Sequence, residues 1–112
     1  MDNSRKKDLV RAYKEQKSRP GIFAVRCVAT GEAWVASAPD VGRKQSGIWF
    51  QLRIGSFPNK ALQAAWKSNG EAAFAFEVLE EVDDENALLI PAILKERAAH
   101  WRTQLGAGPV ID

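Results

Sequence analysis

The sequence predicts a small α/β domain in which helices flank a three-stranded antiparallel sheet, in the order α-β-β-α-α-β-α. The chain has 112 residues, which is room for one domain and not for two. Two runs of β-branched and aromatic residues lie close together, and a third follows after two helix-like segments. Apolar residues make up 46% and charged residues 27% of the chain, as is typical of a globular protein rather than a disordered one.

Composition excludes several classes of function. No apolar run approaches the roughly 18 residues of a membrane span, and no apolar signal segment follows the charged residues 1–8. The single cysteine, Cys27, excludes an internal disulfide and a cysteine-rich zinc site, which favours a reducing cytoplasm. The single histidine, His100, argues against a histidine-based metal cluster or a Ser-His-Asp triad. Most hydrolase chemistry is therefore not expected.

The first elements are a helix and a β-hairpin. Residues 3–18 predict a short helix within an N-terminal extension, residues 1–20, which ends at the Arg-Pro-Gly sequence. Residues 22–28 and 32–36 are rich in β-branched and aromatic side chains, and Thr30 and Gly31 supply a turn between them. This pattern predicts two antiparallel strands.

Two helices follow the hairpin. Asp40 can cap a helix over residues 41–54, and Gly55 ends it. Asn59 can cap a second helix that runs to residue 69, where another glycine follows.

The last part of the chain predicts a strand and a long helix. The alternation of side chains along residues 73–80 predicts a third strand. Asp83 and the next aspartate start a final helix that extends to residue 105, with Pro91 either kinking it or opening its second part. Residues 106–112 are expected to form a loose tail.

Four further residues are interpreted as core. Trp49, Trp66 and Trp101 occur at helical spacing among apolar neighbours, and Cys27 lies in the middle of a strand.

Charge is distributed unevenly along the chain. Residues 1–69 contain 13 Lys/Arg and 5 Asp/Glu, whereas residues 70–112 contain 3 and 9, although the net charge is only +2. A basic surface of this kind is typical of a protein that faces phosphate groups. The alternative interpretation is that the two halves of the chain attract each other within one fold.

An ordered set of four motifs resembles the GIY-YIG nuclease family. The name-giving triplets stand as Gly-Ile-Phe at 21–23 and Trp-Val-Ala at 34–36. They are followed by an N…LQxAW block at 59–66 and an FxFEVLE block at 74–80. The resemblance covers residues 21–81 without a gap and implies a domain over 21–105. The N-terminal helix is similar to an extension carried by a bacterial subgroup of small stand-alone members.

The resemblance implies an endonuclease that cleaves a phosphodiester with one divalent cation, Mg²⁺ or Mn²⁺. In such a site a signature tyrosine activates water, an arginine on the next helix stabilises the phosphate, and a glutamate on a later helix holds the metal. This sequence departs from that pattern. Phe23 and Trp34 stand at the tyrosine positions, and neither side chain can accept a proton from water. Trp34 is interpreted as a buried aromatic, with stacking on a nucleotide base as the alternative.

The other catalytic positions also differ from the family pattern. Lys44 stands at the arginine position, and its neighbour Arg43 points about 100° away on a helix, so it does not simply substitute. Ile48 replaces a histidine that is frequent in the family. On the final helix, Ala98 occupies the expected place of the metal carboxylate, and Glu96, two residues away, is the candidate metal ligand. We therefore predict a largely dismantled catalytic set.

The leading hypothesis is a catalytically impaired member that binds nucleic acid, DNA rather than RNA, through a basic hairpin-helix face and without a cofactor. The candidate phosphate contacts are the basic residues of the hairpin and of the two helices after it, namely Arg26, Arg43, Lys44, Arg53, Lys60 and Lys67. Six such contacts predict that the logarithm of affinity falls against the logarithm of salt concentration with a slope of about −5.

Two alternatives stay open. A divergent endonuclease dependent on Mg²⁺ or Mn²⁺ would use Lys44 or Arg43 together with Glu96. A protein-interaction module would use the former active-site cleft, because Phe23, Trp34 and Ile48 make that cleft apolar. No membrane partner is expected.

Overall fold

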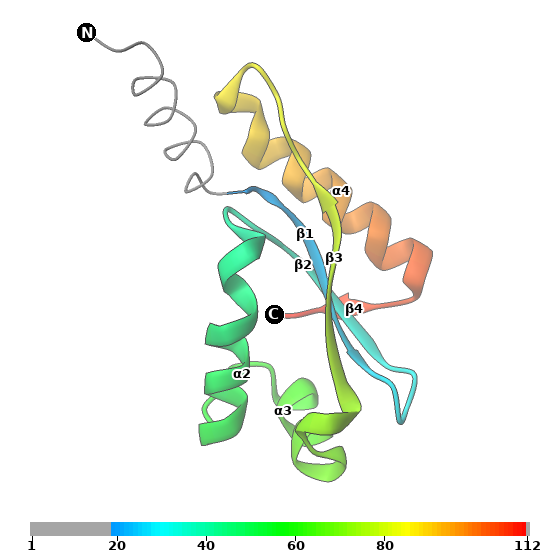
Figure 1. Ribbon diagram of the computed structural model, residues 1–112. Coiled ribbons are helices and arrows are strands. Elements are labelled where there is room, and N and C mark those ends of the chain that lie inside the picture. Colours follow the sequence, from blue (N-terminus) through cyan, green and yellow to red (C-terminus); the bar gives the residue numbers. More distant parts are fainter. Residues whose placement is uncertain (1–18, 112) are drawn as a thin grey trace, which may run out of the picture.

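A computed structural model describes residues 19–111, which form a four-stranded sheet with helices on both faces (Figure 1). The strands are β1 (Gly21–Cys27), β2 (Ala33–Ala38), β3 (Phe74–Glu81) and β4 (Gly108–Pro109), in the spatial order β3-β1-β2-β4. The central strand β1 pairs antiparallel with both β2 and β3, and β4 pairs parallel with β2. The predicted hairpin and third strand are therefore confirmed.

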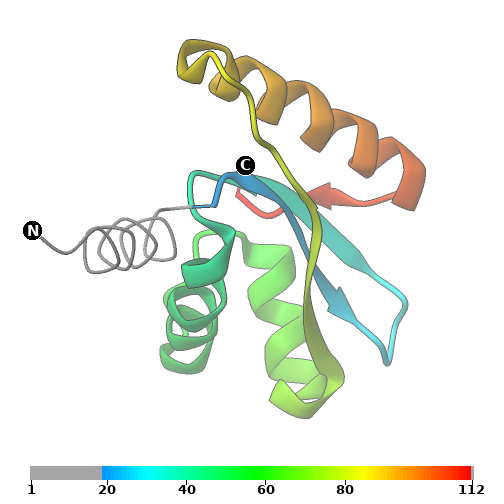
Figure 2. The same cartoon turned by 45° about the horizontal axis from the view of Figure 1, so that its top comes forward.

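The helices divide between the two faces of the sheet (Figure 2). Helices α2 (Lys44–Ile54) and α3 (Lys60–Asn69) cover one face, and α4 (Ile90–Leu105) covers the other. No helix in the described part of the chain is long and apolar enough to span a bilayer. The helix predicted over residues 3–18 lies outside the described residues.

Alternation along β1 produces two hydrophobic cores. Phe23 and Val25 point toward α2 and α3, where Trp49 and Trp66 are also buried. Ile22 and Ala24, which alternate with them along β1, belong to the core beneath α4. Because β1 is buried on both faces, its sequence is almost continuously apolar. The buried positions of Trp49, Trp66 and Cys27 agree with their interpretation as core residues, and Trp101 packs half-buried against the second core.

The caps predicted for the two middle helices are present. The Asn59 side chain accepts a hydrogen bond from the Leu62 N–H at the start of α3. Asp40 accepts one from the Gly42 N–H and begins a short 3₁₀ helix, Val41–Arg43, from which α2 continues. Gly55 ends α2 in the left-handed conformation, with φ of 78°. The segment predicted as one helix over 41–54 is thus a 3₁₀ turn followed by α2.

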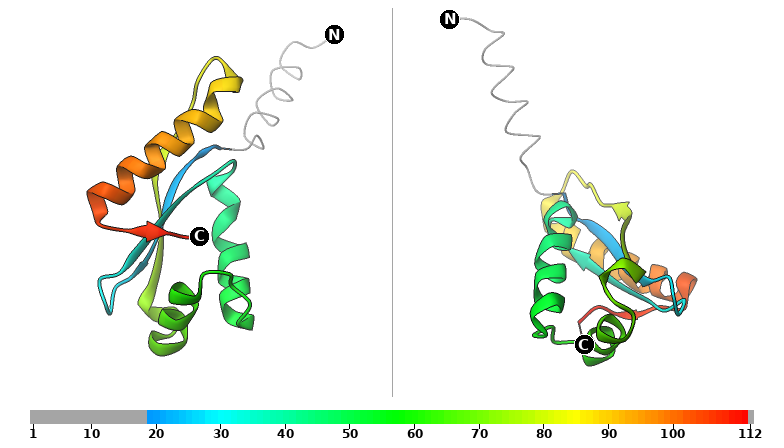
Figure 3. Two further views of the ribbon diagram at one scale, coloured as in Figure 1. Left: turned by 180° about the vertical axis from the view of Figure 1, so that it is seen from behind. Right: turned by 60° about the horizontal axis from the view of Figure 1, so that its bottom comes forward.

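The C-terminal segment corrects the prediction of a three-stranded sheet and of a loose tail over residues 106–112. Gly108–Pro109 forms a fourth strand beside β2, and Val110 is almost completely buried, with 1% of its surface exposed. The Asn59 side-chain amide donates a hydrogen bond to the Pro109 carbonyl at 2.9 Å. Asn59 lies fifty positions before Pro109 in the chain, so no local pattern could reveal the contact. Figure 3 (left) shows the C-terminal segment, in red, returning from the end of α4 to the sheet.

The final helix begins later than the sequence predicts. Asp83 and Asp84 do not start it, because the Val82 N–H donates to the Pro20 carbonyl and prolongs the extended chain beyond β3. A 3₁₀ helix, Ala87–Leu89, precedes α4, and Pro91 stands in the first turn of α4. Proline lacks a backbone N–H, and the first turn is the helical position that does not need one. Of the two roles considered for Pro91, the structure shows the one that opens the helix.

Helix α4 is fastened to β3 by one carboxylate. Glu80 Oε1 accepts hydrogen bonds from the Arg97 guanidinium at 2.8 Å and from the Trp101 indole N–H at 2.9 Å. The hydrogen bond from Trp101, followed by that from Arg97, lowers the pKa of the Glu80 carboxyl below its ordinary value. This contact orients the helix, a neighbouring side of which lines part of the site described below.

We expect Asn59→Ala to lower the free energy of unfolding by about 2 kcal/mol, because it removes both a helix cap and the link to β4. The matched control is Asn86→Ala, since Asn86 caps only an exposed 3₁₀ helix through the Leu88 N–H. Its loss should stay below about 1 kcal/mol. Equal losses in urea denaturation of the two variants would contradict an anchoring role for Asn59.

Candidate nucleic-acid interface

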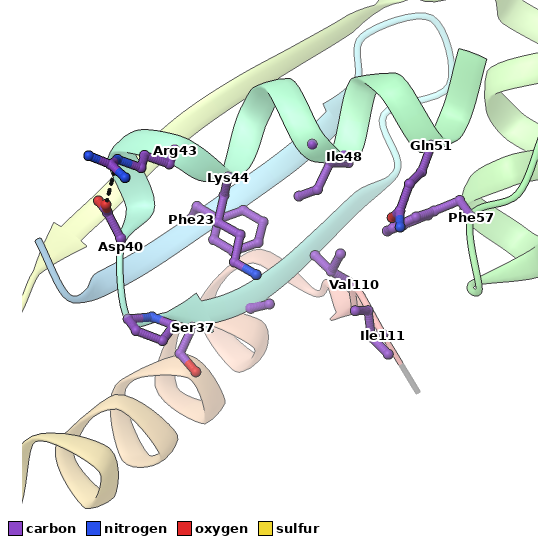
Figure 4. A pocket seen from close by; sticks show the side chains of 13 residues that line it. Phe23, Ser37, Asp40, Arg43, Lys44, Ile48, Gln51, Phe57, Val110 and Ile111 are labelled. Atoms are coloured by element: carbon purple, nitrogen blue, oxygen red, sulfur yellow. Dashed lines mark ion pairs between the residues drawn. The ribbon is translucent and has the colours of Figure 1, made fainter. Parts of the chain in front are cut away.

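A pocket of about 590 Å³ lies between α2, the ends of β1 and β2, and the C-terminal segment (Figure 4). Its floor is apolar and includes Phe23, Ile48, Phe57 and Val110. Lys44 enters it from the first turn of α2. The pocket therefore combines an apolar floor with the Lys44 ammonium, and Asp40 and Arg43 also line it.

The turn between β2 and α2 places the first residues of α2 over the pocket. The Asp40 carboxylate accepts hydrogen bonds from the Gly42 N–H at 3.1 Å and from the Arg19 N–H at 3.4 Å. On the other side of the sheet end, β1 starts at Gly21, where a Cβ atom would collide with the main-chain oxygen of Glu80 on β3. A glycine at this position lets the two strands approach and leaves room beside them for Val41 of the 3₁₀ helix.

Arg43 and Lys44 are adjacent but have different surroundings. The Arg43 guanidinium lies 3.4 Å from the Asp40 carboxylate, and its side chain is 80% exposed. Figure 4 shows it pointing away from the pocket, whereas Lys44 extends into the pocket toward Phe23. Of the two cations named from the sequence, only Lys44 presents its charge to the pocket.

The two signature aromatics are packed within the fold. Phe23 is 2% exposed and stacks on Phe76, with ring centroids 5.1 Å apart. Trp34 is 5% exposed and stacks on Phe74 at 6.5 Å, next to β4 rather than in the pocket. Neither side chain carries a group that could act as a base, and Trp34 lies outside this pocket.

The six basic residues named from the sequence do not form one surface. Arg26 projects from the α4 face of the sheet and forms an ion pair with Glu77 at 2.8 Å. Arg53 binds Glu71 through two hydrogen bonds, at 2.6 and 3.1 Å, and these lower the pKa of the Glu71 carboxyl. Lys60 lines a separate hollow beside β4. Lys67 lies on α3 close to Gly55, at the far end of α2 from Lys44.

A second pocket, of about 480 Å³, adjoins the first across the end of β2. Both are lined by Ser37 and Pro39, so we describe them together as the cationic groove. On the far side of β2, the groove is lined by α4, which contributes Lys95 and Arg102. Within the described residues neither of them nor Lys44 takes part in an ion pair.

Sequence reasoning missed Lys95 and Arg102. Both lie in the acidic half of the chain, whereas the charge count indicated a phosphate-facing surface in the basic half. The signal was their spacing, because Lys95, Ala98 and Arg102 recur on one side of an α-helix. The Arg102 guanidinium also donates to the Val35 carbonyl at 3.1 Å, which holds it beside β2 without neutralising its charge.

The residues of the groove do not fit a divalent cation. Glu96 is exposed on a different side of α4 from the residues that line the groove, and the one groove carboxylate, Asp40, is engaged by the Gly42 N–H and Arg43. The α4 residues that line the groove are Ile90, Pro91, Leu94, Lys95, Ala98 and Arg102. Magnesium and manganese require oxygen ligands, and carboxylates supply most of them in proteins. Among residues 19–111 no group of three or more His, Cys, Asp and Glu side chains could hold a metal ion.

The architecture is a GIY-YIG nuclease-like fold. Two solved structures, one of the catalytic domain of the homing endonuclease I-TevI and one of a mutant of that domain, are similar to this chain. The mutant matches with a TM-score of 0.67 and 24% identity over 79% of this chain and 84% of its own. The other matches with a TM-score of 0.68 and 22% identity over 83% and 99%. At these identities the likeness establishes the fold.

Two further comparisons gave no match. No protein-family model and no curated protein corresponds to the sequence.

We expect millimolar Mg²⁺ or Mn²⁺ to leave the melting temperature unchanged relative to NaCl at equal ionic strength, because a ligand that binds the native state raises it. Differential scanning fluorimetry would measure this. A rise in melting temperature that is lost in Glu96→Ala and kept in Glu85→Ala, an exposed carboxylate outside α4, would contradict the assignment.

Proposed function

We propose that this domain binds nucleic acid through the cationic groove and does not cleave it by a metal-dependent reaction. The observation that carries the proposal is the position of Lys44, Lys95 and Arg102 on the two sides of the end of β2. All three charges lack an acidic partner among the described residues. A row of such cations along a hollow is the arrangement that binds a phosphate backbone.

The remaining charges support this choice of surface. Three arginines of the basic half form ion pairs with glutamates of the acidic half: Arg19 with Glu81, Arg26 with Glu77, and Arg53 with Glu71. Of the three groove cations only Lys44 belongs to the basic half, because Lys95 and Arg102 lie within residues 70–112. The paired arginines serve the attraction between the halves, and the groove supplies the charge that is available to a phosphate.

DNA is the nucleic acid that we expect, by analogy with the endonuclease domains that share the fold, and the analogy rests on fold alone. Binding is proposed without cleavage because no tyrosine stands at the signature positions and Ala98 faces the groove where a metal carboxylate is required. Lysine offers a point charge rather than the planar fork of arginine, so Lys44 suits phosphate binding better than bidentate stabilisation of a reacting phosphate.

We expect the protein to bind a labelled DNA duplex more weakly as the salt concentration rises. In fluorescence anisotropy with EDTA present, the logarithm of affinity should fall against the logarithm of salt concentration with a slope of about −3, because three cations contribute about 0.9 each. Lys44→Gln should reduce the steepness of the slope by about 0.9. Lys60→Gln is the matched control, since this exposed lysine lies outside the groove and should leave the slope unchanged.

The same experiment separates the competing functions. A slope of about −5 would mean that the paired arginines also contact phosphate, which contradicts the assignment of the groove. Absence of binding at low salt would remove the proposal in favour of a protein-interaction module. Nicking of the duplex on addition of Mg²⁺ or Mn²⁺, abolished by Glu96→Ala, would establish the divergent endonuclease instead.

A further inference from the structure

The apolar floor of the first pocket has no role in binding a phosphate backbone. We propose that this pocket takes the base of an unpaired nucleotide from a nucleic-acid strand that lies in the cationic groove. The inference rests on the proposed function and names its substrate class: a single strand, a flap or a bulge rather than an uninterrupted duplex.

The floor is suited to a flat aromatic ring. Phe23, Ile48 and Phe57 line the floor and are each at most 7% exposed, so the apolar area that each presents is held in place by the core. The volume of about 590 Å³ lies within the range of pockets that hold small organic ligands. Bases stack on apolar and aromatic side chains with little regard to sequence, so such a floor would accept any of them.

The polar groups of the pocket are placed for the rest of a nucleotide. Figure 4 shows Lys44 and Gln51 on the same helix over the floor, with the Gln51 amide beside Phe57, whereas the Ser37 hydroxyl points toward α4. The Gln51 amide carries both a donor and an acceptor, as the edge of a base does. The Lys44 ammonium is suited to the phosphate next to that base. One lysine, one amide and an apolar floor thus match the parts of one nucleotide, and the Asp40 carboxylate that also lines the pocket is paired with Arg43.

An unpaired nucleotide fits this pocket better than a paired one. A base inside a duplex is stacked on both faces, and it reaches a pocket only by flipping out, at a cost of unstacking and unpairing. The cost is least where the base is already unpaired. An acidic peptide with an apolar side chain could use the same lysine and floor, and this alternative is a separate outcome of the test.

Gly47 allows the pocket to be filled without disturbing the fold. It lies on α2 at the edge of the pocket, and a Cβ atom added to it meets no other atom within 4 Å. Both Gly47→Leu and Gly47→Ala improve helix propensity, so neither variant is expected to unfold. Only leucine is long enough to extend over the floor, which makes alanine the matched control.

The test compares two labelled duplexes that differ by one unpaired adenine, in EDTA and at one salt concentration. Wild-type protein and Gly47→Ala should bind the bulged duplex about tenfold more tightly than the paired duplex, as expected for one stacked base. Gly47→Leu should lose this preference and bind both duplexes equally.

Results that overturn this inference can be distinguished from results that overturn the proposed function. Equal binding of both duplexes by wild-type protein, or a preference that survives in Gly47→Leu, overturns the inference and leaves the proposed function standing. Failure to bind either duplex overturns both. If an acidic peptide then binds wild-type protein but not Gly47→Leu, the pocket belongs to a protein partner.

Discussion

The site depends on the Asp40 carboxylate at the turn between β2 and α2. Its oxygens accept hydrogen bonds from the Gly42 and Arg19 N–H groups and lie 3.4 Å from the Arg43 guanidinium. These contacts fix where the helix starts, and a helix that starts there turns Lys44 into the pocket and Arg43 away from it. A start one residue later would rotate the outer face of α2 by about 100° and remove the lysine from the groove.

The surface chemistry follows from how arginine and lysine are used. Arginine forms the ion pairs that connect distant parts of the chain, as Arg53 does with Glu71 through two parallel hydrogen bonds. Its planar guanidinium favours such geometry, whereas lysine is a strongly hydrated point charge. Among the described residues no lysine forms an ion pair. A count of basic residues therefore overestimates the charge that is available to a ligand.

Local signals predicted most of the fold, and contacts between distant residues account for what they missed. The hairpin and the Asn59 cap could be predicted because turn and cap residues act on their immediate neighbours. The strand at Gly108–Pro109 depends on Asn59, and the late start of α4 depends on Val82 bonding to Pro20. At the site, Lys44 could be predicted from its spacing relative to the sequence motifs. Lys95 and Arg102 became visible only when α4 was placed against β2.

The central claim is that DNA binds at the end of β2, between α2 and α4. Titration of ¹⁵N-labelled protein with unlabelled duplex, followed by NMR, tests it most directly. The account predicts that the largest amide shifts fall within residues 37–48 and 95–102, on the two sides of the groove. Shifts centred instead on Arg26 and Arg53, with residues 37–48 unaffected, would contradict it.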